Sequence, residues 1–99
     1  MKAIKRYVDV LKEEIEGAQE YAERYVECKA AGEAQKANRY KEMAHDELKH
    51  AMYIHEWAVA KIEEVSKVYT PPVKMEEAWR LAHKEYVEEV ATIKKMLEM

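Results

Sequence analysis

The sequence predicts an all-α fold, and three observations support this prediction. The 99-residue chain contains only two glycines and two prolines, so turns are few and the elements between them must be long. Hydrophobic residues make up 48% and charged residues 37% of the chain, a combination typical of amphipathic helices. Apolar residues recur at steps of three and four, the period of an α-helix. We expect one small domain over residues 1–99.

The first helix is expected over residues 3–30. Its apolar residues share one face of the helix, namely Tyr7, Val10, Leu11, Ala18, Tyr21, Tyr25 and Cys28. Gly32 follows the last of these residues and suits the left-handed conformation that often ends a helix. The first helix should therefore end just before Gly32.

A second helix is expected over residues 33–67 and a third over residues 75–97. The apolar face of the second consists of Tyr40, Met43, Ala44, Ala51, Ile54, Ala58, Ile62 and Val65. The segment Tyr69-Thr70-Pro71-Pro72 then ends the helical pattern, because two successive prolines cannot continue a helix. The third helix has an apolar face formed by Trp79, Ala82, Tyr86, Val90, Ile93 and Leu97.

The length of the second helix predicts self-association. At about 1.5 Å per residue, a helix over residues 33–67 spans roughly 50 Å. A three-helix monomer of this size cannot bury the whole apolar face of such a helix. We therefore expect a homo-oligomer, a dimer or a multiple of dimers, in which two chains complete a four-helix bundle.

Three polar residues interrupt the apolar faces and are the candidate metal ligands. Glu14 lies among apolar residues of the first helix, while Glu47 and His50 lie among those of the second. His50 follows Glu47 by three positions, so both side chains project from nearly the same face. Burying unpaired carboxylates is costly, and a bound cation would offset that cost.

An antiparallel hairpin would bring these residues to one level. Glu14 and His50 each lie eighteen residues from Gly32, which corresponds to about 27 Å of helix, and Glu47 lies at about 22 Å. Two carboxylates and one imidazole should therefore converge between the helices. Oxygen and nitrogen donors of this kind suit iron, manganese or zinc.

The same residues carry a resemblance to a known family. Glu14, Tyr21, Gly32 and Glu47-Leu48-Lys49-His50 resemble the Glu, Tyr, Gly and Glu-x-x-His of the first hairpin in rubrerythrin-like ferritins, over residues 7–60. In that family, a Glu from each of two helices and a Glu-x-x-His from each of two others hold two irons. The resemblance implies a ferritin-like hairpin with a third, C-terminal helix.

The last third of this chain lacks a second Glu-x-x-His, because the residue three positions before His83 is Arg80. The chain is similar in length and layout to encapsulated-ferritin proteins, which pair two hairpins and often carry a tail that docks them inside a protein shell. Here the last five residues, 95–99, continue the third helix. The resemblance implies a site for two irons shared by two chains, and a nanocompartment shell as a further partner.

The expected function is oxidation of ferrous iron for storage or detoxification, with Glu14, Glu47 and His50 of each chain acting at the metals. Dioxygen or peroxide would be the oxidant. Manganese or zinc could occupy the same ligands. Two other functions stay open: an oligomer that is stabilised by metal without catalysis, and a structural helical adaptor.

Several neighbours have less specific roles. Tyr21 could hydrogen-bond a ligand carboxylate or fill the core, Asp46 could accept the free ring N–H of His50, and Glu13 could guide cations inward or lie in solvent. The helical positions of His45, His55 and His83 place them away from the site. Three residues of the third helix come near its level but should be exposed, namely Glu88, Glu89 and Thr92.

Charge and composition exclude other classes. Basic and acidic residues alternate at a net charge of −3, so no nucleic-acid interface is expected. No segment is long and apolar enough to span a membrane, and the N-terminal residues lack a signal-peptide core. The single Cys28 has no internal disulfide partner, which favours a reducing, cytoplasmic compartment.

Overall fold

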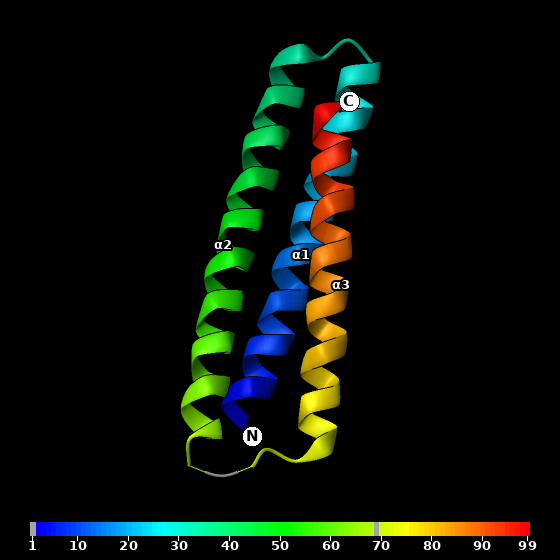
Figure 1. Cartoon of the computed structure of the whole chain (residues 1–99). Coiled ribbons are helices and arrows are strands. Elements are labelled where there is room, and N and C mark those ends of the chain that lie inside the picture. The colour runs from blue at the N-terminus through cyan, green and yellow to red at the C-terminus, as the bar shows by residue number, and fades with distance from the viewer. Residues whose placement is uncertain (1, 69) are drawn as a thin grey trace.

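The computed structural model describes residues 2–68 and 70–99, which form three α-helices (Figure 1). They are α1 (Lys2–Ala30), α2 (Ala34–Ser66) and α3 (Val73–Glu98), and no strand occurs among the described residues. The predicted all-α class is confirmed. The third helix begins two residues earlier than expected, since Pro72 supplies the extended residue that precedes it (φ −58°, ψ 144°). Tyr69, in the expected break between helices, lies outside the described residues.

A tight turn reverses the chain between α1 and α2. Gly32 has a φ of 77°, as predicted for the residue after a helix C-terminus. The backbone N–H of Glu33 donates to the Cys28 carbonyl (2.9 Å) and the N–H of Gly32 to the Lys29 carbonyl (3.1 Å). This pair of hydrogen bonds is the Schellman motif, which satisfies carbonyls that the end of α1 would otherwise leave without a donor. The turn therefore sets α1 and α2 side by side and antiparallel (Figure 1).

Small residues allow α1 and α2 to approach closely. Five alanines on the facing surfaces are completely buried, namely Ala18, Ala22, Ala44, Ala51 and Ala58. The separation of packed helices depends on the side chains at the contact, and alanines bring two backbones near the lower limit. Larger residues, including Leu11 and Ile15 on α1, complete the core. The close approach brings side chains beside this seam within reach of each other.

The third helix packs mainly along α1 (Figure 1). Ile93 and Leu97 are 1% exposed and belong to the same core as Leu11 and Ile15. At the far end of α3, the Lys29 ammonium donates to the Met99 carbonyl. The three helices therefore run up, down and up in chain order, and α3 lies on one side of the α1–α2 hairpin (Figure 1).

The molecule is long and thin, measuring 55 × 17 × 17 Å with a radius of gyration of 16.0 Å. A compact domain of this length has a radius of about 13 Å. Each helix therefore buries only part of its circumference. None of the helices formed by the described residues is long and apolar enough to cross a membrane.

The apolar faces expected from the sequence divide into two stripes in the structure. The inner stripe of α1 and α2 is buried and includes Leu11, Ala18, Ala44 and Ala51. The outer stripe is half-buried or exposed and consists of Tyr7, Val10, Tyr21, Tyr40, Met43 and Ile54, together with Trp57, which the expected faces did not include. We call this outer stripe the site face, because the candidate ligands lie within it.

Candidate metal centre

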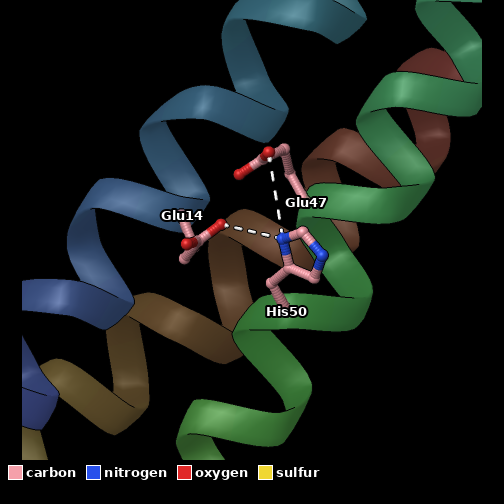
Figure 2. A group of neighbouring side chains, drawn as sticks. All are labelled: Glu14, Glu47 and His50. Atoms are coloured by element: carbon pink, nitrogen blue, oxygen red, sulfur yellow. Dashed lines mark ion pairs between the residues drawn. The ribbon is translucent and has the colours of Figure 1, made fainter.

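The hairpin brings Glu14, Glu47 and His50 together near its middle, as Figure 2 shows. One ligand atom from each residue lies within 4.8 Å of the other two. His50 Nδ1 is 3.4 Å from Glu14 Oε2 and 3.9 Å from Glu47 Oε1. The expected convergence of the three side chains is present, while their role as ligands stays a prediction.

Helical spacing places both carboxylates at the edge of the buried core. Glu14 lies one turn from buried Leu11 and Ala18, and Glu47 lies between buried Ala44 and Ala51. The side chains of Glu14 and Glu47 are 25% and 26% exposed, whereas that of His50 is 53% exposed. The carboxylates therefore lie partly inside the seam and the imidazole lies at its opening.

A residue that the sequence interpretation did not single out shapes this site. Gly17 lies in the middle of α1, where glycine costs about 0.5–1 kcal/mol relative to alanine. A Cβ at this position would stand 3.3 Å from Glu47 Oε2 and 3.6 Å from Glu47 Cδ. The missing side chain therefore makes room for the Glu47 carboxylate. A mid-helix glycine, in a chain with only two, is the sequence signal that could have identified it.

The two carboxyl groups of the site lie close enough for Glu14 to disfavour the negative charge of Glu47. While both carboxyl groups are ionised, the buried Glu14 Oε2 has no hydrogen-bond partner, although the ring of His50 is near. The pKa of Glu47 is raised from 4.5 to about 7. The largest cause is hydrogen bonding with Glu14, which requires a proton; burial and the charge of Glu14 raise it further, while His50 opposes the shift.

The donor set fits a divalent first-row metal. Carboxylate oxygens and an imidazole nitrogen are donors that iron, manganese and zinc accept. The buried, unpartnered oxygen of Glu14 is an acceptor that a cation would satisfy. Three residues provide too few donors to hold two metals within one chain.

Among the described residues, no hydrogen bond joins Tyr21, Asp46 or Glu13 to the three candidate ligands. The ring of Tyr21 stacks on that of Tyr40, with centroids 6.3 Å apart. Asp46 and Glu13 are exposed, and among the described residues neither forms a hydrogen bond to a candidate ligand. Asp46 acts only through its charge, which adds slightly to the raised pKa of Glu47. The role of Asp46 as an acceptor for the His50 ring N–H stays a prediction.

The third helix stays away from the centre. Figure 2 shows α3 passing behind the hairpin, while the three side chains face the opposite side. Glu89 lies instead beside Leu11, Lys12 and Ile15 of α1. Burial and the charges of Glu85 and Glu16 raise the pKa of Glu89. The Thr92 hydroxyl donates to the Glu88 carbonyl within its own helix.

The site face around the centre is apolar and open. Met43 is 39% and Trp57 55% exposed, and both lie on the α2 stripe that carries Glu47 and His50. Tyr7 of α1 and Trp57 of α2 line one shallow hollow on this face. Large exposed apolar residues that flank a partly buried polar group are typical of an association surface.

Comparison of the chain with models of protein families, with curated proteins and with solved structures found no match.

Proposed function

We propose that this protein is a ferritin-like, di-iron carboxylate ferroxidase whose site is shared by two copies of the chain. Ferrous ions are the substrate, and Glu14, Glu47 and His50 of each copy hold them. Iron bound there would supply electrons to dioxygen or peroxide. Manganese or zinc would be held by the same donors.

The observation that carries this proposal is the pair of carboxylates at the seam. Glu14 Oε2 is buried without a hydrogen-bond partner, and the pKa of Glu47 is raised to about 7. Such a pair is unfavourable unless a proton or a cation lies between the two groups. His50, 3.4 Å from Glu14, adds the neutral nitrogen donor that iron accepts.

A second copy explains two features at once. Two copies placed with their site faces together provide four carboxylates and two imidazoles, the ligand set of a four-helix di-iron site. The same contact buries Met43 and Trp57, which one copy leaves 39% and 55% exposed. Because α3 covers the other side of the hairpin, it leaves this face free for the partner (Figure 2).

Each residue has a distinct part in binding the substrate. Glu47 must lose its proton before it can bind a cation, so binding is coupled to proton release near neutral pH. Gly17 leaves the space into which the Glu47 carboxylate fits. The half-exposed ring of His50 stands at the opening of the seam, where an incoming ion would meet it first.

The test is ferrous oxidation by stopped-flow absorbance after anaerobic loading and exposure to oxygen. Wild type should oxidise iron faster than buffer does, and Glu47→Ala and His50→Ala should lose most of that acceleration. His45→Ala is the matched control, because His45 is an exposed imidazole on the same helix. Metal binding without acceleration would leave a metal-stabilised oligomer, and neither binding nor acceleration would leave a structural adaptor.

A further inference from the structure

Two histidines that the sequence interpretation kept apart meet between α2 and α3. His55 Nε2 and His83 Nδ1 are 2.8 Å apart, although 28 residues separate them in the chain. His55 lies five residues beyond His50, on a different face of α2, so the pair shares no residue with the carboxylate centre. The pair is therefore a separate cluster of nitrogen donors.

Aromatic packing fixes the ring of His55. The ring of Tyr86 stacks on it with centroids 4.5 Å apart and an interplanar angle of 12°, and Trp79 lies 5.4 Å away. His83 is exposed, so its ring is open to solvent. One nitrogen donor is thus held in place by packing and the other is accessible to an ion from outside.

The spacing of the two nitrogens suits two ligands of one metal. With metal–nitrogen bonds of about 2.0–2.1 Å, an angle of about 90° at the metal separates the nitrogens by about 2.9 Å. A tetrahedral angle would separate them by about 3.3 Å. The observed 2.8 Å is therefore closer to the right angle of square-planar or octahedral ions such as Cu²⁺ and Ni²⁺.

The charge state of His55 also favours a cation. In a hydrogen bond between two neutral imidazoles, one ring donates its N–H and the other accepts. Both facing nitrogens can bind a metal once the donor ring carries its proton on its other nitrogen, which requires that neither ring holds a second proton. Burial and the proximity of His83 lower the pKa of His55, so its ring is neutral at neutral pH, against the opposing charge of Glu56. That nearby carboxylate provides negative charge beside the pair.

We propose that His55 and His83 form a second metal site, which binds a late first-row divalent ion of the Ni²⁺ or Cu²⁺ type through two imidazoles. Water fills the remaining coordination positions. Since α3 packs mainly along α1, the ion adds a direct link between α2 and α3.

The experiment titrates Ni²⁺ into the full chain by calorimetry, in a Glu47→Ala background that removes the carboxylate centre. One ion should bind per chain, and His83→Ala or His55→Ala should weaken binding roughly tenfold or more. The His45→Ala control should bind like the background. Because Glu47 is absent throughout, the result does not depend on the ferroxidase proposal.

A spectroscopic measurement accompanies the titration, because His55→Ala also removes a packed ring. Pulsed electron paramagnetic resonance of bound Cu²⁺ should detect two coupled imidazoles in the background protein and one in its His83→Ala variant. Equal Ni²⁺ affinity in His83→Ala and His45→Ala, or one coupled imidazole in the background, would overturn the proposal and leave only a hydrogen bond between the rings.

Discussion

Replacing Gly17 with alanine should stabilise the metal-free protein and weaken its response to metal. In the middle of α1, alanine is favoured over glycine by about 0.5–1 kcal/mol because glycine loses more backbone entropy on folding. For a domain of this size, that gain raises Tm by roughly 2–8 °C. The new Cβ meets only the end of the flexible Glu47 side chain, at 3.3 Å, so the metal-free chain can accommodate it.

The metal-bound state has less freedom. A carboxylate displaced by a few tenths of an ångström leaves the range of about ±0.2 Å that metal–ligand distances tolerate. We expect metal affinity to fall about 10–100-fold, which removes roughly 1.4–2.7 kcal/mol of metal-linked stabilisation. The variant should thus unfold at a higher temperature than wild type without metal, and gain less when metal is added.

The assay is thermal unfolding followed by circular dichroism, without metal and with anaerobic Fe²⁺ or with Mn²⁺. Gly32→Ala is the matched control. Its backbone φ of 77° strains any residue with a Cβ, but no atom lies within 4 Å of the added group. That variant should lose about 1–2 kcal/mol of stability without metal and keep the full metal response. If Gly17→Ala keeps the full metal response too, Gly17 does not position a ligand.

Two further predictions concern pH and assembly. The folded pKa of Glu47 is raised from 4.5 to about 7, so the native chain holds this proton more tightly than the unfolded chain. The contribution of Glu47 to metal-free stability is therefore largest below pH 4.5 and is lost as the pH rises through 7. Solvent screening of this partly exposed group reduces the effect to roughly 1–2 kcal/mol, measurable by denaturant unfolding at pH 5 and 7.5, and Glu47→Gln should abolish it. Trp57→Glu, on the site face, should shift the oligomer towards monomer in light scattering and remove the metal-induced rise in Tm, whereas Leu81→Glu, on the exposed side of α3, should change neither. An unchanged mass for Trp57→Glu would place the interface elsewhere.

The sequence was sufficient for the helices because their signals are local. Gly32, the two prolines and the apolar period each act within a few residues, so the three helices and the first turn could be predicted. Glu14 and His50 are the same number of residues from Gly32, so the helical rise per residue places them at the same height in the hairpin. These features do not depend on how helices pack at a distance.

Features that depend on contacts between helices could not be predicted from local sequence signals. Met43 and Ala44 both belong to the apolar face expected for the second helix, yet Met43 is 39% exposed and Ala44 0%. Two stripes about 100° apart on one helix merge into a single pattern when only spacing is considered. The meeting of His55 and His83 depends on the lateral position of α3, which no local signal specifies. Gly17 was missed because its role is to leave space for a residue on another helix.

The central claim is that two chains share one centre for two metals. An anomalous-scattering map, from crystals grown with Mn²⁺ or with Fe²⁺ under anaerobic conditions, tests it most directly. We predict two metal peaks between two copies of the hairpin, with Glu14, Glu47 and His50 of both copies around them. A peak enclosed by one chain alone, or no peak beside Glu47 and His50, would contradict it.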